Sequence, residues 1–523
     1  MIINYKKSAG LLMLLFVFTS GFGGDNPGMN SFNSIRLIES DNNWLRTGNS
    51  AGMIFNDDRN AVMFQGGMNY GDGSFHRIME ASERDDYFFT TESYRKLNDR
   101  IFLYGRFTYH NLDEKGALWN GTYDPYRGNP YILGDSVSGA TYHKENYELA
   151  GKMAYKLSRT LSLGSAVSYF VAMGAKQKDP RPENTVTMFT INPSLLIRKE
   201  NFKAGIDAGY RHRKEVIDYI KFVSDNSDPT YFMFKGFGFF NSMISGGTER
   251  HQSMNEIFGG LQFEKKIMGI PFLTEVRFNG TKEKIEDGSS TIRKEDAGDW
   301  NTSGFDLSEQ LAFDAGPGHH RLKALFSYFN GDGIEYMQDV VYVDNVAEYQ
   351  TVAKYSKFNR EVYQAAVHYD YWKMLDKDRL SWMVKAGINF KDNQEAYHYI
   401  PETFTSSYSN LGADLEIQKD FYCGSLHFSP VAGAGYVWNL TSDLFLSDDP
   451  GITLKQNTGI YEHEFDYYTS GLFRLNGKLA IGYQPRKLKD IGEIYLDVSY
   501  NYCEQTDHND HYGLFSAKLG FIF

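Results

Sequence analysis

The 523-residue sequence predicts an all-β fold, a transmembrane antiparallel up-and-down β-barrel of about 18 strands, within a range of roughly 16–20. Three observations predict this fold. Apolar and polar residues alternate along most of the chain, the connections between alternating segments fall into a short and a long class, and the last residue is an aromatic at the end of a strand. A soluble β-sheet is the alternative, but it would not sort its connections by length so consistently.

The last strand is the clearest element. One of its faces carries Gly513, Phe515, Ala517, Leu519, Phe521 and Phe523, and the more polar face carries Ser516 and Lys518. Such alternation predicts a strand with one apolar side. A strand that ends in an aromatic at the final residue resembles the C-terminal signal of bacterial outer-membrane barrels. The resemblance implies that outer-membrane lipid surrounds the protein and that the barrel-assembly machinery recognises this strand.

The N-terminal residues predict a secretory signal peptide over residues 1–23. Lys6 and Lys7 precede an apolar run from Leu11 to Phe18, and Gly21 and Gly23 have the spacing of a cleavage site. The run is shorter than the ~20 residues that a membrane-spanning helix needs. We expect residues 24–59 to form a periplasmic or intraluminal N-terminal segment and residues 60–523 to form the barrel.

Composition excludes some classes of protein. A formal net charge of −12 argues against a nucleic-acid partner, and two cysteines cannot provide a disulfide framework. The mean hydropathy of −0.47 would suggest a soluble protein. However, membrane-spanning strands need only ~9–11 alternating residues and escape hydropathy windows. Aromatic residues, 16% of the chain, suit both pleated strands and the aromatic girdles of membrane barrels.

Working back from Phe523, about eighteen strands are predicted, an even number as a closed bacterial barrel requires. They lie near residues 508–523, 490–503, 468–484, 423–438, 409–420, 379–395, 358–374, 319–330, 303–314, 271–285, 253–265, 202–213, 185–198, 160–174, 143–156, 99–112, 84–95 and 60–70. The stretches 74–82 and 340–352 also have an extended pattern, so the number of strands can differ by about two.

The connections alternate between short turns and long loops. The short set is 96–98, 157–159, 199–201, 266–269, 315–318, 375–378, 420–422 and 485–489. The long set includes 113–142, 214–252, 331–357 and 439–467. Short periplasmic turns and long extracellular loops are typical of outer-membrane barrels, and they predict that both termini lie at the periplasmic rim.

The polar faces of the strands predict a lumen lined by charges of both signs. The residues expected there are Arg106, Lys203, Asp207, Arg211, Glu275, Arg277, Lys385, Arg474, Lys478 and Asp497. Two interpretations stay open, a lined passage and a network of paired charges that fills a closed barrel. In the same register Glu309 points toward lipid, which a bulge or a position near the rim would explain.

One long loop is rich in phenylalanine: Phe232, Phe234, Phe237, Phe239 and Phe240. Five such side chains would form a large apolar patch if they were exposed, and such patches usually mark binding surfaces. The loop is expected to fold into the barrel as a constriction or to dock a partner protein. The alternative is that it packs on neighbouring loops above the membrane.

No enzymatic or cofactor site is expected. Asp507, His508, Asp510 and His511 are weak candidates for metal ligands, because imidazole and carboxylate bind divalent metals but the spacing matches no known metal motif. The sequence contains no P-loop or dinucleotide fingerprint, and no spacing unites Ser, His and Asp as a catalytic triad requires. Cys423 and Cys503 are expected at opposite rims of a band ~25 Å tall and therefore to be free thiols.

The chain as a whole resembles uncharacterised outer-membrane β-barrel proteins of the Bacteroidota, through its signal peptide, Tyr/Phe-rich strands and terminal aromatic. The segment 49–53, N-S-A-G-M, resembles the N-P-A-G-L segment inside fatty-acid porins, and its alternative is an ordinary glycine-containing turn. The first resemblance implies a location in the cell outer membrane and a channel or uptake porin for small solutes or nutrients. Two alternatives remain, an accessory barrel that partners a TonB-dependent transporter or a surface lipoprotein, and an outer-membrane enzyme.

Overall fold

The computed structural model of the chain describes residues 31–56, 60–135, 140–177, 181–220, 230–244, 249–288, 294–343, 346–376, 379–400, 402–446, 455–485 and 492–523. The expected signal peptide, residues 1–23, lies outside the described residues. Among the residues that the structure describes, no helix is long and apolar enough to cross a membrane.

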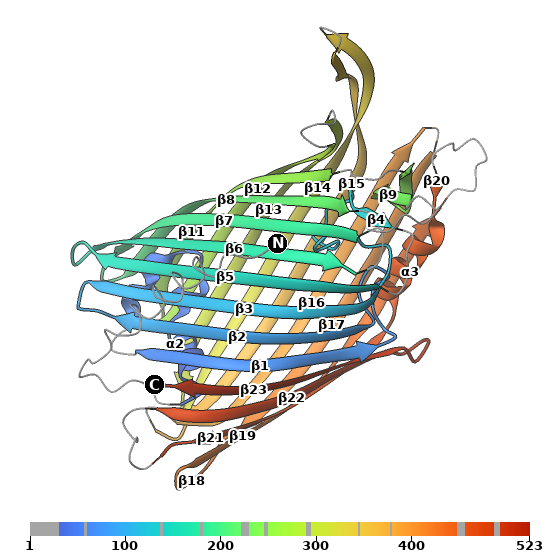
Figure 1. Cartoon of the computed structure of the whole chain (residues 1–523). Helices are drawn as coiled ribbons and strands as arrows, with labels where there is room; N and C mark the ends of the chain where they lie inside the picture. The colour runs from blue at the N-terminus through green and yellow to red at the C-terminus, as the bar shows by residue number, and fades with distance from the viewer. Residues whose placement is uncertain are drawn as a thin grey trace, which may run out of the picture.

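The described strands form a closed antiparallel barrel of eighteen strands (Figure 1), which confirms the predicted fold. The strands are β1 (Ala61–Gly73), β2 (Glu83–Lys96), β3 (Ile101–Ala117), β5 (Ala140–Lys156), β6 (Leu161–Lys176), β7 (Arg181–Arg198), β8 (Phe202–Ile220), β11 (Glu249–Ile267), β12 (Ile270–Asp287), β13 (Glu295–Ala315), β14 (Gly318–Val343), β15 (Val346–Met374), β16 (Leu380–Tyr399), β17 (Glu402–Lys419), β19 (Leu426–Phe445), β21 (Leu472–Tyr483), β22 (Glu493–Gln505) and β23 (His511–Ile522). A short strand β18 (Phe421–Cys423) also pairs with β19.

The predicted last strand, β23, closes the ring. It pairs with β22 on one side and with β1 on the other, from Met63 opposite Ile522 to Gly73 opposite Tyr512. The terminal Phe523 extends this row, because its backbone N–H and C=O both hydrogen-bond to Val62, at 2.9 and 2.7 Å. Thus the first and last strands of the barrel hydrogen-bond to each other along their whole length.

The two faces of the wall differ as the alternation predicts. Large apolar side chains on the outer face are exposed, such as Ile257 at 72%, Leu519 at 62% and Ile388 at 57%. Neighbouring residues on the inner face are mainly polar or glycine, such as Glu256 beside Ile257 and Lys518 beside Leu519. An apolar exterior around a polar interior is the arrangement that a barrel in lipid requires.

The two ends of the barrel carry different connections. We call the end with short connections the turn rim and the opposite end the loop rim. β1 begins and β23 ends at the turn rim. A two-residue connection between β11 and β12 consists of Met268 and Gly269, both with positive φ (52° and 86°), as a turn of type I′ requires.

The prediction of a long loop over residues 331–357 is wrong. β14 and β15 instead continue as a paired hairpin to Val343 opposite Val346. Beyond Ile334, which still faces Asp299 of β13, β14 pairs with β15 alone, and the hairpin rises beyond the loop rim in Figure 1. The reason is that β-branched and aromatic residues such as Val340, Tyr342 and Tyr349 keep alternating past the membrane-spanning part.

The structure also locates Glu309 and the two cysteines. Glu309 does lie on the outer face, six residues before β13 ends at Ala315, and its Oε2 accepts a 2.6 Å hydrogen bond from Thr274 Oγ1. A position near the turn rim therefore explains it, without a bulge. Cys423, at the turn rim, and Cys503, near the end of β22, are both free thiols, as predicted.

The two faces give a test of the barrel in lipid. Replacing the outward Ile388 by arginine is expected to lower the free energy of unfolding by ~2–4 kcal/mol, because the charge would face hydrocarbon. The matched variant at the inward neighbour, Asn389→Arg, should cost much less, since this position is exposed to the lumen. Urea unfolding in lipid vesicles measures both, and equal losses would contradict the assignment of the faces.

Candidate functional site: a lumen plugged at both ends

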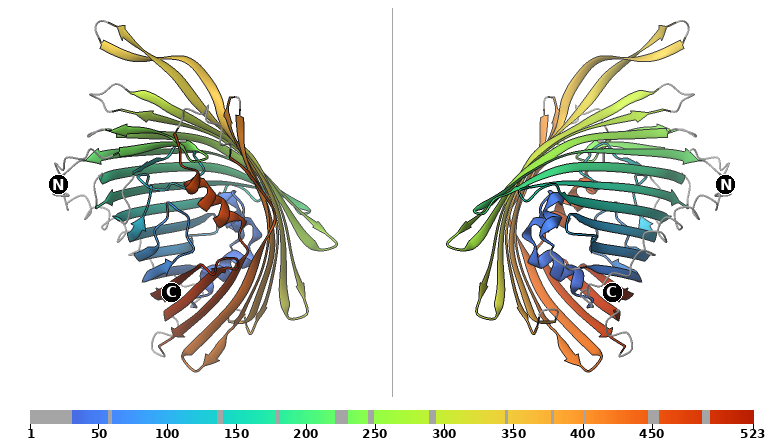
Figure 2. Two further views of the ribbon diagram at one scale, coloured as in Figure 1. Left: turned by 90° about the vertical axis from the view of Figure 1, so that its right-hand side faces the viewer. Right: turned by 90° about the vertical axis from the view of Figure 1, so that its left-hand side faces the viewer.

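The first plug is the N-terminal segment, residues 31–56. It consists of helix α2 (Ser34–Asp41) and the 3-10 helices η1 (Asn43–Arg46) and η2 (Ser50–Phe55). Viewed from the turn rim, these helices lie inside the barrel (Figure 2, right). Of the two locations expected for this segment, the structure places the described part in the lumen. We call it the N-terminal plug.

Apolar contacts hold the N-terminal plug against two areas of the wall. Leu37 and Ile38 are 1% exposed and pack in a cluster with Tyr94, Tyr495 and Ile522. Trp44 packs in a second cluster formed with Phe102, Ala154, Leu196 and Leu273. The first cluster involves β2, β22 and β23 and the second β3, β5, β7 and β12, so the plug spans several strands.

Predicted lumen charges anchor the same plug. Glu275 Oε1 accepts a 2.9 Å hydrogen bond from the Gly48 N–H, and it also contacts Arg277. Trp44 Nε1 donates to Glu264, whose other oxygen is 2.6 Å from Lys203 Nζ. Lys203, Glu275 and Arg277 therefore serve the contact with the plug as well as the wall.

The N-S-A-G-M segment, 49–53, packs tightly against the wall. Asn49 caps η2 and donates to the Leu195 carbonyl at 2.9 Å, and Ser50 Oγ is 3.0 Å from Ser194 Oγ. Gly164 of β6 is required for this approach, because a Cβ there would lie only 2.2 Å from Ala51 N. The segment is thus a 3-10 helix wedged against β6 and β7, not a free turn.

A buried histidine fastens the start of the plug at the turn rim. His427 Nε2 is 3.0 Å from Asp420 Oδ2 and Nδ1 is 3.3 Å from Glu493 Oε1. The ring lies between Phe32 and Tyr422, each with its centroid 4.3 Å away. Both nitrogens face accepting oxygens, and only the doubly protonated imidazolium can donate from both.

The carboxylates around His427 hold the plug directly. Glu493 Oε2 accepts from the Phe32 N–H at 2.9 Å, and Asp420 Oδ2 accepts from Asn33 Nδ2 at 2.8 Å. We call Asp420, His427 and Glu493 the histidine latch. The sequence reasoning missed it, because Asp420 lies between β17 and β18, His427 lies in β19 and Glu493 in β22, and its partner Phe32 is 461 positions from Glu493.

The second plug lies at the loop rim. It is a four-stranded sheet of β20 (Lys455–Gln456), β10 (Phe239–Ile244), β9 (Thr230–Gly236) and β4 (Leu133–Asp135), with helix α3 (Thr458–Thr469) beside it. Viewed from the loop rim, α3 lies across the mouth of the barrel (Figure 2, left). We call these elements the loop plug.

The phenylalanine-rich segment forms the core of the loop plug. Phe234, Phe237 and Phe239 are at most 5% exposed. Phe237 and Phe239 pack in one cluster with Trp300, Phe358, Tyr397 and Phe404 of the barrel wall, whereas Phe232 and Phe240 are half-buried in a neighbouring cluster around Phe234. These side chains therefore form no exposed apolar patch, because they are buried against the inner wall and against one another. Docking of a partner stays a prediction that these buried rings do not support.

Charged and polar pairs tie the loop plug to the wall. Lys235 Nζ is 2.7 Å from Glu335 Oε2, and Tyr461 OH donates to Glu395 at 2.6 Å. In the loops themselves, Tyr126 OH donates to Glu464 Oε1 at 2.7 Å. Burial raises the pKa of Glu464 above its ordinary value, and the hydrogen bond from Tyr126 opposes this shift.

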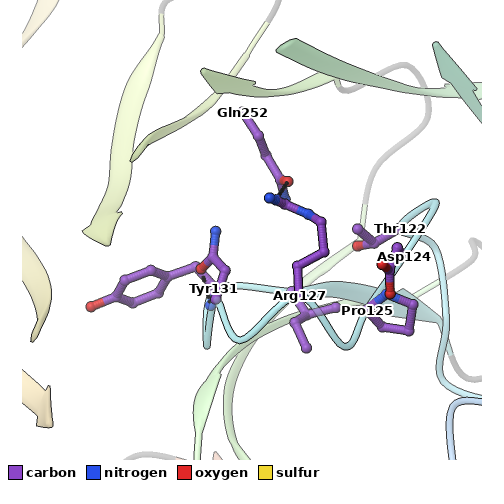
Figure 3. Close-up of a pocket in the computed structure, with 8 residues that line it drawn as sticks. Thr122, Asp124, Pro125, Arg127, Tyr131 and Gln252 are labelled. Atoms are coloured by element: carbon purple, nitrogen blue, oxygen red, sulfur yellow. Dashed lines mark hydrogen bonds between the residues drawn. The ribbon is translucent and has the colours of Figure 1, made fainter. Parts of the chain in front are cut away.

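A cavity beside the loop plug is too small for a solute. Figure 3 shows it between the 122–132 loop and Gln252, with Arg127 crossing it. Arg127 Nη2 is 3.0 Å from Gln252 Oε1 and 2.6 Å from Glu283 Oε1. The volume of about 10 Å³ accommodates roughly one water molecule.

Ion pairs line the inner face of the wall, and some of them also hold the N-terminal plug. Nine of the ten predicted lumen residues take part in one, and the pairs are Arg106–Glu148 (2.7 Å), Lys203–Glu264 (2.6 Å), Arg211–Glu256 (2.5 Å), Arg277 with Asp207 (3.1 Å) and Glu275 (3.2 Å), Lys385–Glu416 (2.9 Å) and Lys478–Asp497 (2.7 Å). Arg106 and Glu148 are nonetheless 39% and 37% exposed. Space for solvent therefore remains beside this pair on the inner wall.

The weak metal candidates do not form a site. Asp507, His508, Asp510 and His511 surround the tight turn between β22 and β23, in which Gln505 N–H donates to the Asp510 carbonyl at 2.8 Å. Within the part of the chain that the structure describes, no three His, Cys, Asp or Glu side chains are grouped as a metal ion would require.

Known structures with a similar fold are outer-membrane transporters. They include the ferric preacinetobactin receptor BauA from Acinetobacter baumannii (8% identity, 89% of this chain and 80% of that chain, TM-score 0.39) and the transporter YddB from Escherichia coli (8%, 89% and 81%, 0.39). The copper transporter OprC matches at 10% identity over 86% of this chain and 62% of that chain, with a TM-score of 0.42. At these identities the likeness concerns the barrel fold alone.

Sequence comparison places residues 50–523 in a model described as a family of unknown function, DUF6850. No curated protein matches the sequence. These comparisons give no support to the resemblances to Bacteroidota barrels or to fatty-acid porins.

The close approach at Gly164 gives a test of the N-terminal plug. Gly164→Ala places a methyl group against Ala51 and Ser50 and is expected to weaken the docking by ~1–3 kcal/mol, the usual range for an overpacked site. Hydrogen exchange of the amides in η2 measures the release, and it should accelerate. The control is Gly105→Ala, where no atom lies within 4 Å; if both variants exchange alike, the contact is not what holds η2.

The histidine latch gives a second test. His427→Phe keeps a ring between Phe32 and Tyr422 but removes both donors, leaving two buried carboxylates without their cation. A loss of ~3–5 kcal/mol is expected, as for other broken buried ion pairs. Urea unfolding and hydrogen exchange over α2 measure the effect. Tyr422→Phe, which removes only a 3.4 Å hydrogen bond to Asp420, should change little; a similar loss in both variants would argue against the latch.

Proposed function

The chain belongs to DUF6850, a family of unknown function, so we infer its role from its own structure. We propose that it is an outer-membrane uptake barrel for small hydrophilic solutes. In this proposal the N-terminal plug is the gate on the turn-rim side and the loop plug is the gate on the loop-rim side. The observation that carries the proposal is the solvent-exposed, charge-lined lumen between two plugs of the same chain.

The two faces of the wall support the location. Exposed leucine, isoleucine and aromatic side chains cover the outside of the strands, as contact with lipid requires. The turn rim then faces the periplasm and the loop rim faces the exterior, the usual arrangement of short turns and long loops. The known structures with this fold come from outer-membrane transporters, and this likeness concerns the fold.

Charges in the lumen favour passage of polar solutes over a merely structural filling. A barrel filled only for stability would gain more from apolar side chains, since buried ion pairs often contribute little net stability. Here the side chains of pairs such as Lys385–Glu416 are 39% and 31% exposed, so water can occupy the lumen beside them. Solutes cross only when the plugs move, because both plugs contact the wall across several strands.

A reversible lock tests the gate. Ser50 and Ser194 Oγ atoms are 3.0 Å apart, so Ser50→Cys with Ser194→Cys places two sulfurs within reach of a disulfide. Cys423→Ser and Cys503→Ser remove the native thiols. In proteoliposomes, swelling in small polar solutes should stop when the lock is oxidised and return when it is reduced. Each single cysteine variant is the control.

A barrel gated by the N-terminal plug should behave differently in the two states of the lock. The reduced barrel must admit solute, and the oxidised barrel must admit less. Swelling that is absent in both states would contradict an uptake function. Swelling that is equal in both states would show that solute passes without movement of the N-terminal plug.

A further inference from the structure

Two opposite charges on the inner face of the wall form no ion pair with each other, whereas charges near them do. Arg474 is the predicted lumen residue that takes part in no ion pair with any residue the structure describes, and Asp414 likewise has no such partner. Both side chains are exposed, although their strands face lipid on the other side through Leu415 and Leu475. Two charges thus face the solvent of the lumen without neutralising each other.

The strand register fixes how these charges are placed. Asp414 of β17 lies directly opposite Gly435 of β19, and Gly435 lies directly opposite Arg474 of β21. The two charged residues are therefore at the same level of the wall, about 10 Å apart between Cα atoms. Gly435 has no side chain, so the wall between the two charges is bare backbone.

Polar side chains cover the neighbouring glycines of the wall. Gly387, on the other side of Asp414, would place a Cβ only 2.7 Å from Asp414 Oδ1, so the carboxylate rests against the wall at this glycine. One level nearer the turn rim, Asn476 covers Gly433 in the same way. Gly435, by contrast, has no polar side-chain atom over it, and we call this bare stretch of wall between Asp414 and Arg474 the recess.

The recess lies close to the loop plug. Asn410, four residues from Asp414 along β17, donates to the Tyr468 carbonyl of α3 at 2.8 Å. Arg474 lies near the start of β21, the strand that follows α3 in the chain. A solute that enters past α3 would therefore reach this level before it reaches the N-terminal plug.

We propose that Asp414, Gly435 and Arg474 form a binding site for a zwitterionic solute of amino-acid or dipeptide size, an inference that rests on the uptake function proposed above. The solute carboxylate pairs with the Arg474 guanidinium, which binds carboxylates in a bidentate way. The solute ammonium pairs with Asp414. An extended dipeptide spans at most ~7 Å, which fits between two side chains whose Cα atoms are about 10 Å apart.

The arrangement discriminates against other solute classes. A simple anion meets Asp414 beside its binding group, and a simple cation meets Arg474, so each encounters a repulsive charge. A neutral solute of the same size leaves both charges without a counter-charge. Only a solute with both charges, separated by a short backbone, satisfies both ends of the recess.

Charge variants test the site in proteoliposomes, with glycylglycine as the zwitterion and erythritol as the neutral solute. Arg474→Gln and Asp414→Asn should each lower the ratio of dipeptide flux to erythritol flux by about fivefold, the value of one exposed ion pair at its upper range. The double variant Asp414→Arg with Arg474→Asp should restore the ratio, because the dipeptide can bind in the reverse direction. Restoration by a charge swap is not expected of a merely structural role.

The matched control is Lys284→Gln with Glu286→Gln, which removes a Lys–Glu pair joined at 2.9 Å on the outer face of β12, outside the lumen. It should leave the flux ratio unchanged. A flux ratio that is insensitive to Asp414 and Arg474, or a charge swap that does not restore it, would overturn the site.

Equilibrium dialysis separates this inference from the uptake function. Radiolabelled glycylglycine is dialysed against the detergent-solubilised barrel and the same variants. If no solute crosses the membrane, the uptake function fails, yet binding that is lost in Arg474→Gln and regained in the swap still supports the site. Absence of binding to the unmodified barrel would overturn the site even if solutes cross.

Discussion

The structure depends on the pairing of every backbone N–H and C=O along the wall. In hydrocarbon an unpaired group costs several kcal/mol, so a sheet that spans a membrane must have no free edge. Here the row of hydrogen bonds between β1 and β23 removes the last two edges, and Phe523 and Val62 complete it at the turn rim. Once the ring is closed, alternation alone decides which side chains face lipid and which face the lumen.

Closure creates an interior that the wall side chains alone do not fill, since barrels of this strand number enclose a wide space. The chain fills it from both ends with its own segments. The N-terminal plug uses apolar residues such as Trp44 together with carboxylates of the wall, and the loop plug uses phenylalanine rings against Trp300 and Phe358. Between the plugs, most predicted lumen charges neutralise each other, which keeps a polar interior compatible with a stable wall.

The wall could be predicted from the sequence because its rule is local. A period of two along each strand, with turns such as Met268–Gly269, defines faces and order, and every predicted strand has its counterpart. The ends of the strands at the loop rim were less predictable. β14 and β15 keep their alternation beyond the membrane, where no apolar band marks the limit.

The plugs could not be predicted, because their contacts join residues far apart in the chain. The ring of Phe239 packs against Tyr397 and Phe404, and that of Phe32 stacks on His427. The local sequence pattern predicts neither contact. For Arg474, alternation predicts the inward direction. Its separation from Asp414 depends on Gly435, and thus on which three strands are neighbours at that level.

The hairpin of β14 and β15 has a mechanical consequence. A two-stranded ribbon is marginally stable by itself in water, so its order must come from the wall at its base. That base is also where the loop plug rests: Glu335 of β14 contacts Lys235 of the plug, and Gly331 and Gly333 make room for Trp300 and Tyr131. A force that bends the tip of the ribbon would therefore act first on the contacts that hold the loop plug.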